Sequence, residues 1–406
     1  MKIALVCLWY LPEDWGGVPV SVHALASGLR DLGHDVTVLT STAQKALRNS
    51  ERFEEGIRVI RIKRSEWPWQ LQHLPIVGRH ATSLQLLLYS VRLARTLKRI
   101  EERLKFDIIE YVDVNGESAF HTWAAVSVPY VVRLQTPLFV IERFGTRFER
   151  GSYLFLGWME KRAIQKAAML ISPSRSMAQI VASSCGLQVS DIKIIINPLD
   201  PEYFTPLPSA REFNFPRNTV LYIGRLEKRK GAFVFAEAIP GIRKAFPDAY
   251  FVFAGPDRHS PAGGSSREEI ERYLVQSGID SRHVSFLGQV PRAKLRACYT
   301  EAEVVTAPSL YEDYPYAVME PMACGAAVVS SDCYGIPEII SHGVTGLLAK
   351  TGDSADLAQQ IVTLLNNPAQ KRQLGEAAKK FMQEKCSPRR VADLTIQAYK
   401  DAIRQK

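Results

Sequence analysis

Short apolar runs alternate with amphipathic stretches along the whole chain, and this alternation occurs twice. In the first half, runs rich in β-branched residues occupy 2–8, 35–40, 106–112, 130–135 and 169–172, and a helical pattern covers 18–33. The second half restarts with similar runs at 219–224, 250–255, 283–288, 303–309 and 326–332. Continuous apolar runs separated by helical segments are typical of parallel strands buried on both faces. The pattern therefore predicts an α/β fold made of two doubly wound, Rossmann-like domains.

A proline-rich segment separates the two halves. Five prolines lie between Pro198 and Pro216 and interrupt any regular element there. We therefore expect a first domain over 1–196 and a second over 197–386. Ser387 followed by Pro388 is a typical helix start, which predicts a final helix within 387–406.

The positive charge of the chain is concentrated in its first half. The formal net charge is +9, and residues 52–105 alone carry 12 basic against 5 acidic residues. This region mixes aromatic and apolar residues with cations: Trp67, Trp69 and Leu74 lie among Arg61, Lys63, Arg64 and Arg79. Such a mixture over 61–79 suits an anionic membrane surface or an acidic acceptor, and a solvated face beside a packing loop explains it equally well. Because no nucleic-acid-binding motif accompanies the charge, we expect no nucleic-acid partner.

Cysteine usage and the lengths of the apolar runs favour a cytoplasmic protein, with peripheral contact at the inner membrane face if the basic region binds lipid. The six cysteines show no CxxC or metal-finger spacing, which indicates reduced, mostly buried thiols and predicts no metal site. The first apolar run soon meets Glu13 and Asp14, so it is more typical of a strand than of a signal peptide. No apolar stretch reaches the roughly 18 residues that a membrane-spanning helix needs.

Ligands of open parallel sheets bind beyond the carboxyl ends of the strands, so the residues that follow the predicted strands are candidates for a site. Gly16 and Gly17 follow the first strand and precede a helix, whose free amides favour a phosphate. Glycines in this position are also common as simple turn formers. Their spacing is neither GxGxxG nor GxxxxGK[ST], which argues against a dinucleotide or P-loop site.

Four cations follow the first strand of the second half. Arg225, Lys228, Arg229 and Lys230 precede Gly231 and another helix. Like charges this close repel one another unless they are solvated or face an anion, and arginine binds phosphate in a bidentate manner. The cluster therefore predicts a diphosphate site that needs no metal. A solvated basic turn is a realistic interpretation for Lys228 and Arg229, and less so for Arg225.

Two carboxylates eight positions apart follow a later strand of the second half. Glu312 lies in the loop after 303–309, and Glu320 lies about one turn into a short helix that Gly325 closes. Because a carboxylate accepts two hydroxyl hydrogen bonds, a pair at different depths suits a ribose and a hexose. The alternative, of equal weight on these residues alone, is that Glu320 only caps the helix dipole and Glu312 is solvated.

The order of these motifs resembles the retaining glycosyltransferases of family 4, which have the GT-B fold. The second half contains "GRLEKRKG", "FLGQV", "APSLYEDYPYAVMEPMACGAAVV", "GIPEII" and "GVTGLL" in that family's order and spacing. The first half adds a looser match at "GGVPVSVHALASGLRDLGHDVTVLT", and "NPLDPEYFTP" stands at the family's interdomain link. The resemblance covers nearly the whole chain. It implies two domains that face each other across a cleft, a C-terminal helix that crosses back to the first domain, and chemistry without a metal.

The resemblance also implies roles for individual residues. Arg225 and Lys230 would bind the donor diphosphate and stabilise its charge as the sugar leaves. Glu312 would contact the donor hexose, Glu320 the nucleotide ribose, and Gly17 beside Gly16 the phosphate or sugar. The remaining donor contacts would be Leu287 and Gly288, near the base, and Tyr316 and Ala317.

The acceptor side departs from the family pattern. Where relatives often have a histidine after the strand at 106–112, the candidates are Asp113, Asn115 and Glu117, and Gln135 replaces another frequent histidine. Asp113 is a candidate polar contact or proton acceptor, or else a cap of the following turn. We expect transfer of a hexosyl group from a nucleotide sugar, such as UDP-glucose, to a saccharide or lipid-linked acceptor in polysaccharide or glycoconjugate synthesis. The alternatives are a GT-B nucleotide-sugar 2-epimerase and a non-catalytic sugar-nucleotide binding protein.

Overall fold

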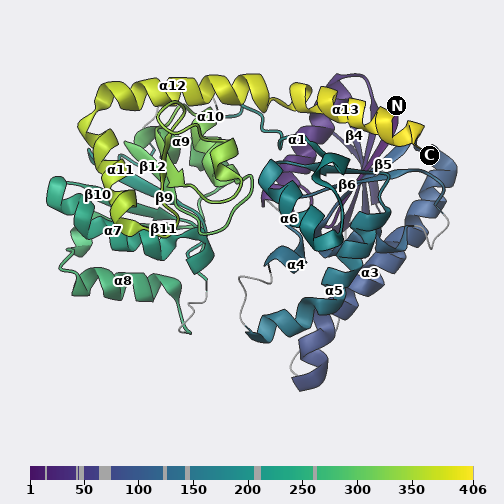
Figure 1. Cartoon of the computed structure of the whole chain (residues 1–406), viewed down its shortest axis with the longest axis horizontal. Coiled ribbons are helices and arrows are strands. Elements are labelled where there is room, and N and C mark those ends of the chain that lie inside the picture. The colour runs from purple at the N-terminus through teal and green to yellow at the C-terminus, as the bar shows by residue number, and fades with distance from the viewer. Residues whose placement is uncertain are drawn as a thin grey trace. The chain divides into compact units, whose positions relative to one another are not determined.

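The computed structural model describes residues 1–406 apart from 14–15, 43, 45–49, 64–74, 122–125, 142–146, 205–211, 259–262 and 406. Side chains are described outside these positions and outside 75–83, 114–115, 141 and 147–154. The chain divides into two compact units, which are Met1–Pro198 with Pro388–Lys406 (unit 1) and Leu199–Ser387 (unit 2). Each unit contains its own sheet with helices around it (Figure 1). The predicted α/β class with two mainly parallel sheets is confirmed.

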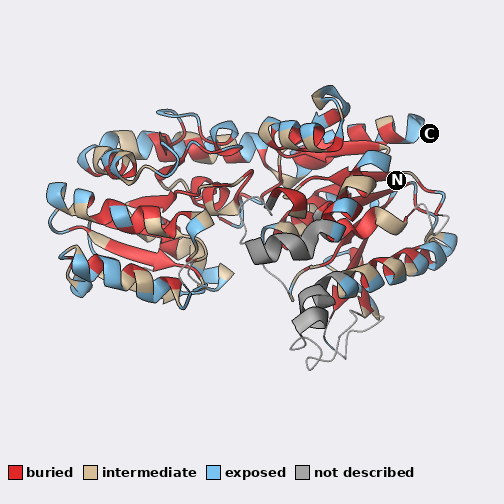
Figure 2. Cartoon of the chain, turned by 60° about the horizontal axis from the view of Figure 1, so that its bottom comes forward, coloured by how far each residue is buried: buried red, intermediate tan, exposed pale blue. Residues whose placement is uncertain are grey.

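Unit 1 is built on an eight-stranded sheet with the order β3-β4-β2-β1-β5-β6-β7-β8. Its strands are β1 (Lys2–Cys7), β2 (Asp35–Thr42), β3 (Ser50–Glu54), β4 (Ile57–Lys63), β5 (Ile108–Val112), β6 (Tyr130–Arg133), β7 (Met169–Ser172) and β8 (Ile192–Ile194). All neighbouring pairs are parallel except the antiparallel β3–β4 hairpin. The central strands are buried along almost their whole length, as Figure 2 shows in red, because the sheet carries helices on its faces.

The apolar pattern missed three strands of unit 1. β3 is mostly exposed and polar, β8 has only three residues, and β4 has two arginines and a lysine among its apolar residues. Arg61 of β4 is only 1% exposed because it pairs with Glu54 of β3, at 2.9 Å from Nη2 to Oε2, and with Glu13, at 3.4 Å from Nε to Oε1. The prediction that Arg61 belongs to an exposed basic patch is therefore wrong. The other residues of that patch lie outside the described side chains, except the half-buried Lys63.

The helices of unit 1 include the last helix of the chain. They are α1 (Gly17–Asp31), α3 (Pro75–Leu104), α4 (Leu138–Ile141), α5 (Arg147–Lys166), α6 (Arg175–Cys185) and α13 (Pro388–Arg404), with the 3-10 helix η2 at Val114–Phe120. α13 packs against α1 at Gly28, where an added Cβ would lie 2.2 Å from the carbonyl oxygen of Pro388. This confirms the predicted return of the last helix to the first domain.

Unit 2 is built on a six-stranded parallel sheet with the order β11-β10-β9-β12-β13-β14. Its strands are β9 (Thr219–Ile223), β10 (Tyr250–Ala254), β11 (Val284–Gly288), β12 (Val304–Ala307), β13 (Val328–Ser331) and β14 (Leu347–Ala349). Its helices are α7 (Ala232–Ala245), α8 (Ser266–Gln276), α9 (Arg292–Glu301), α10 (Tyr316–Ala323), α11 (Ser354–Asn366) and α12 (Pro368–Lys385). Five of the six strands follow the predicted apolar runs. β14 has only three residues, too few to show a period.

The chain passes between the units at two points that lie together in unit 2. The backbone N–H of Leu199 donates to the carbonyl oxygen of Cys386 at 2.8 Å, so the segment entering unit 2 is tied to the segment leaving it. Among the described residues, no helix is both long and apolar enough to cross a membrane.

Candidate functional site

Two loops at the carboxyl edge of the unit 2 sheet pack directly on each other. The loop after β9 ends at Gly231, whose φ of 75° is one that glycine adopts without strain. An added Cβ there would lie 1.8 Å from the carbonyl oxygen of Pro308, in the loop after β12. The backbone N–H of Leu310 in that second loop also donates to the carbonyl oxygen of Arg229 at 2.8 Å. β9 and β12 are neighbouring parallel strands, so the basic loop and the loop of Glu312 meet at one edge.

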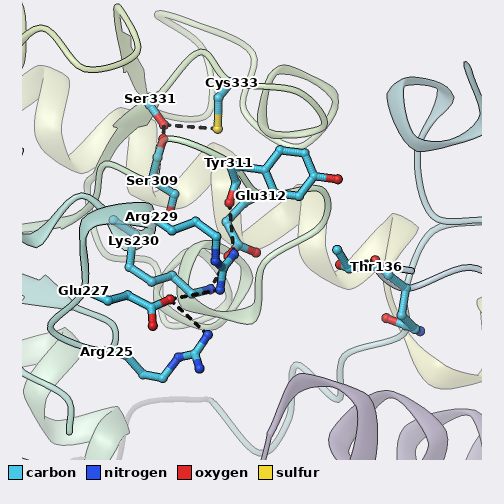
Figure 3. Close-up of polar contacts among 12 residues, drawn as sticks. Thr136, Arg225, Glu227, Arg229, Lys230, Ser309, Tyr311, Glu312, Ser331 and Cys333 are labelled. Carbon is cyan, nitrogen blue, oxygen red and sulfur yellow. Dashed lines mark hydrogen bonds and ion pairs between the residues drawn. The ribbon is translucent and has the colours of Figure 1, made fainter. Parts of the chain in front are cut away.

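The side chains of these loops form a cluster of five charges (Figure 3). Glu312 Oε1 accepts hydrogen bonds from Arg229 Nη1, at 2.6 Å, and from Lys230 Nζ. Glu227 Oε1 lies 3.0 Å from Arg225 Nη2 and 3.1 Å from Arg229 Nη2. Three cations therefore share two carboxylates, and one positive charge stays in excess. Such a cluster has the electrostatic character of an anion site.

Burial and charge oppose each other at Glu312. Burial raises the pKa of this carboxyl, but the cations Lys230 and Arg229 outweigh burial and hold the pKa below its ordinary value. Burial lowers the pKa of Lys230 although Glu312 opposes it. Burial also lowers the pKa of Arg225, and the neighbouring Arg229 adds to this effect. Glu312 is therefore an anion at neutral pH, while its cationic neighbours lack part of the counter-charge that a bound anion would supply.

The structure brings together three residues that the sequence selected, Arg225, Lys230 and Glu312. It contradicts the solvated interpretation of Arg229 and Glu312, because their side chains are 21% and 13% exposed and pair with each other. Lys228 is exposed, as expected for a solvated turn. Glu227, which links Arg225 to Arg229, was missed. A lone acidic residue inside a run of cations was the available signal.

Glu320 lies inside α10 and is 7% exposed. Its Oε2 accepts a hydrogen bond from the hydroxyl of Tyr299 on α9 at 2.8 Å. Burial raises the pKa of Glu320, against the opposing charge of Arg292 and the Tyr299 hydrogen bond. The N-cap of α10 is Pro315, and the first helical turn contains no acidic residue. The alternative that Glu320 only caps this helix is therefore wrong, and Tyr299 is a partner that sequence reasoning missed.

The other predicted donor contacts of unit 2 lie at the same edge of its sheet. Tyr316 and Ala317 begin α10 and are half-buried. Leu287 and Gly288 end β11, which is separated from β9 by β10. The backbone N–H of Gly255 donates to the carbonyl oxygen of Gly288 at 2.8 Å, which ties the ends of β10 and β11 together.

The predicted residues of unit 1 lie at the carboxyl edge of its own sheet. Gly17 begins α1, and Gly16 is its extended and exposed N-cap. Among the described residues, an added Cβ at Gly16 would meet only Pro19 Cδ, at 3.8 Å, so these contacts do not require glycine there. The turn-former explanation of Gly16 is thereby weakened.

Asp113 is buried at the end of β5, with 3% of its surface exposed. Its Oδ2 accepts a hydrogen bond from the backbone N–H of Gln135 at 2.9 Å, while its Oδ1 is buried and has no hydrogen bond to any described residue. Asp113 makes no side-chain cap of η2, so the turn-capping alternative is wrong. Burial raises the pKa of Asp113 to about 7, against the backbone hydrogen bonds that lower it. Burial also raises the pKa of Glu117, whose two carboxyl oxygens are buried and have no hydrogen-bond partner in the part of the chain that the structure describes.

We expect the variant Asp113→Asn to gain stability relative to the wild type as the pH rises. The carboxyl ionises near pH 4 in the unfolded chain and near pH 7 in the folded protein, so folding loses stability as the pH rises through this window. Asparagine has no such loss and keeps an acceptor for the Gln135 amide. Urea unfolding at pH 4 and pH 8 should give a difference between variant and wild type that grows by up to about 4 kcal/mol. A difference that is the same at both pH values would contradict the raised pKa.

No group of three or more histidine, cysteine, aspartate or glutamate residues suited to a metal ion occurs in the described part of the chain. The side-chain cations Arg225, Arg229 and Lys230 give the site its anion-binding character. The site is therefore suited to bind an anionic group beside the ionised carboxylate of Glu312.

Two family models match the chain, one in each half. Residues 207–381 match the family model described as glycosyl transferases group 1, and residues 15–203 match glycosyltransferase family 4. An uncharacterised glycosyltransferase of Methanocaldococcus jannaschii is 28% identical over 420 residues, covering 99% of each chain.

Two solved structures show the same fold. Sucrose-phosphate synthase of Thermosynechococcus elongatus has a TM-score of 0.79 at 21% identity, with 100% of each chain covered. Anabaena HepE in complex with UDP and glucose has a TM-score of 0.71 at 18% identity, covering 98% of this chain and 99% of that chain.

Proposed function

The chain belongs to the group 1 glycosyltransferases of family 4, with the GT-B fold, and we propose that it is a retaining, metal-independent hexosyltransferase. Its donor is a nucleotide sugar, a UDP-sugar such as UDP-glucose, and its acceptor is a saccharide or a lipid-linked acceptor in polysaccharide or glycoconjugate synthesis. The observation that carries this proposal is the cluster of three cations on Glu312 and Glu227, at the carboxyl edge of the unit 2 sheet.

The cations of this cluster fit the charge that develops in the reaction. When a nucleoside diphosphate leaves an anomeric carbon, negative charge builds up on its phosphate oxygens, and fixed cations aimed there lower the barrier. Arg225 and Lys230 take this role. Arg225 is suited to it because its side chain is 40% exposed and pairs with Glu227 at the rim of the cluster. Glu312 contacts the hexose beside the bond that breaks.

The nucleoside part of the donor is assigned to neighbouring elements of unit 2. Glu320 accepts hydrogen bonds from the ribose, with its carboxylate oriented by the Tyr299 hydroxyl. The backbone at Leu287 and Gly288 meets the base, and Tyr316 and Ala317 line the start of α10. The choice of UDP is supported by the complex of the similar Anabaena protein with UDP and glucose.

Unit 1 supplies the acceptor side and further donor contacts. Gly16 and Gly17 present the amino end of α1 to the phosphate or sugar. Asp113 is the polar contact or proton acceptor for the acceptor hydroxyl, and its pKa of about 7 suits reversible proton transfer at neutral pH. The proposed location is the cytoplasm, with a peripheral anionic-membrane contact through the parts of 61–79 other than Arg61.

Two other functions use the same donor residues. A GT-B nucleotide-sugar 2-epimerase would rearrange or release its donor without an acceptor. A non-catalytic sugar-nucleotide binder would hold the donor and never turn it over. Only an acceptor-stimulated reaction distinguishes a transferase from both.

The test is release of nucleoside diphosphate from uridine, guanosine, adenosine and thymidine diphosphate sugars, in the presence of a chelator. Each donor is tested with and without mixed oligosaccharide and polyprenyl-linked acceptors. We expect one donor to give release that rises when an acceptor is added. Binding without turnover with any acceptor would favour the binding protein, and no binding at millimolar donor would overturn the assignment of Arg225, Lys230 and Glu320.

A further inference from the structure

One carboxylate oxygen of Glu312 accepts hydrogen bonds from two cations. Oε1 accepts from both Arg229 and Lys230, and the side chains of these cations are 21% and 19% exposed. The proposed function assigns Lys230 to the donor diphosphate, so Lys230 must serve two anions when the donor binds. If Glu312 lost its contact with Lys230, its carboxylate would need another hydrogen-bond donor to stay in position.

Arg229 is held in place by several hydrogen bonds, made by both its side chain and its backbone. Its Nη1 donates to the carbonyl oxygen of Tyr311 at 3.2 Å as well as to Glu312, and its Nη2 donates to Glu227 Oε1 at 3.1 Å. Its own carbonyl oxygen accepts from the N–H of Leu310. Side chain and backbone of Arg229 therefore hold the loop of Glu312 at three points on residues 310–312.

We propose that Arg229, held by Glu227, is the positioning residue of Glu312 and keeps its carboxylate in place when a donor diphosphate draws on Lys230 and Arg225. The proposal rests on the function proposed above and adds a residue to it. The planar guanidinium is suited to this role because its fixed fork of donors can contact Glu312, Glu227 and the Tyr311 carbonyl at once. Lysine, with one ammonium group, cannot reproduce that arrangement.

The proposal can be tested through the charge of Arg229. Loss of that charge should change the pKa of Glu312, whereas loss of a purely packing contact should not. The charged or titratable groups around Glu312 include Arg229 and Lys230, which pair with it. Arg225, Tyr222, Tyr311 and Cys333 lie nearby. Lys230 and Arg229 together hold the pKa of Glu312 down against burial. Without Arg229, only Lys230 opposes burial, so the pKa of Glu312 rises. With donor bound, Lys230 is shared with the diphosphate and the rise is larger.

The experiment compares Arg229→Gln with Lys228→Gln, a matched control one residue away that removes the same charge from an exposed side chain. We expect Arg229→Gln to lower kcat by about 10- to 100-fold while KM for the donor changes by less than about threefold. The acid limb of the pH profile should move to higher pH, and further for kcat than for kcat/KM. Lys228→Gln should change neither quantity.

Two further variants separate positioning from folding. Arg229→Lys should keep the acid limb near its wild-type place but lose part of kcat. Glu227→Gln should lower kcat by less than Arg229→Gln does and should not move the acid limb to higher pH, because it removes a neighbouring negative charge. A rise in KM at unchanged kcat would overturn the proposal in favour of donor binding by Arg229. Wild-type behaviour of Arg229→Gln would overturn it outright, and the melting temperature of each variant shows whether it is folded.

A measurement without turnover distinguishes this proposal from the proposed function. The pKa of the Glu312 carboxyl, measured by carbon-13 NMR with Glu312→Gln for assignment, should be higher in Arg229→Gln than in the wild type. It should stay near the wild-type value in Arg229→Lys, which keeps the charge, and in Lys228→Gln. If no donor turns over but this pKa responds, the transferase assignment fails and the positioning role stands. If the pKa is the same in all variants, the positioning role fails whatever the enzyme does.

Discussion

Replacement of Glu312 by glutamine is expected to lower kcat by about 100- to 1,000-fold, the loss that removal of one preorganised electrostatic group produces in other enzymes. Glutamine keeps the size of the side chain but removes the charge that faces the proposed donor hexose and holds Lys230 and Arg229. The dissociation constant for the nucleoside diphosphate should change by less than about tenfold and can fall, because two cations lose a competing anion. Steady-state turnover and calorimetric binding of the nucleotide measure the two effects separately.

Glu237→Gln is the matched control for this prediction. Glu237 is exposed on α7 of the same unit, and the same change of charge there should leave kcat and nucleotide binding unaltered. Thermal unfolding shows whether Glu312→Gln is folded, since it leaves two partly buried cations without their partner. Full turnover in a folded Glu312→Gln would remove this residue from the reacting centre. Equal loss of turnover and of nucleotide binding would assign Glu312 to binding alone.

The pattern of apolar residues predicted the strands that carry the sites, and the exceptions have a physical cause. Runs such as β1 and β10 are apolar because helices cover both faces of a parallel sheet, so their sequences alone identify them. The apolar pattern did not identify β4, because the charged residue Arg61 occupies a buried position in that strand. That arginine is stabilised there by Glu54 and Glu13, from β3 and the loop after β1. Pairing between separate segments is not visible in a local pattern.

Because such pairing is not visible in a local pattern, the sequence predicted only part of the candidate site. The rule that ligands bind at strand ends selected Arg225, Lys230 and Glu312, which the fold brings to one edge of a sheet. It did not separate Arg229 from the solvated Lys228, because only the folded structure shows that Arg229 pairs with Glu312 while Lys228 is exposed. The pairing joins residues that lie far apart in the chain, on loops that meet where Gly231 contacts Pro308.

The buried ion pair of unit 1 is the clearest case of such long-range pairing. Arg133 of β6 donates to Glu110 of β5 through Nε at 2.8 Å and Nη2 at 3.1 Å, with side chains only 1% and 4% exposed. Two residues of α13 complete the group. Thr395 Oγ1 accepts from Arg133 Nη2 at 2.9 Å, and the Tyr399 hydroxyl donates to Glu110 Oε2 at 2.8 Å. The pair therefore links the centre of the sheet to the last helix of the chain.

Arg133→Met is expected to destabilise unit 1 by about 3–5 kcal/mol, because it leaves the carboxylate of Glu110 buried without its cation. Urea unfolding measures this loss, and hydrogen exchange should show weaker protection of the α13 amides, which lose the Thr395 contact. Lys193→Met is the matched control. It removes a cation that pairs with α13 at Asp401 across 3.5 Å, but this pair is about half exposed, so its loss should cost less than about 1 kcal/mol.

The double variant Arg133→Met with Glu110→Leu should recover much of the stability, since no buried charge is then unpaired. If Arg133→Met is as mild as Lys193→Met, the ion pair does not hold α13 on the sheet. If the double variant is no better than the single one, the loss comes from packing of the arginine side chain and not from its charge.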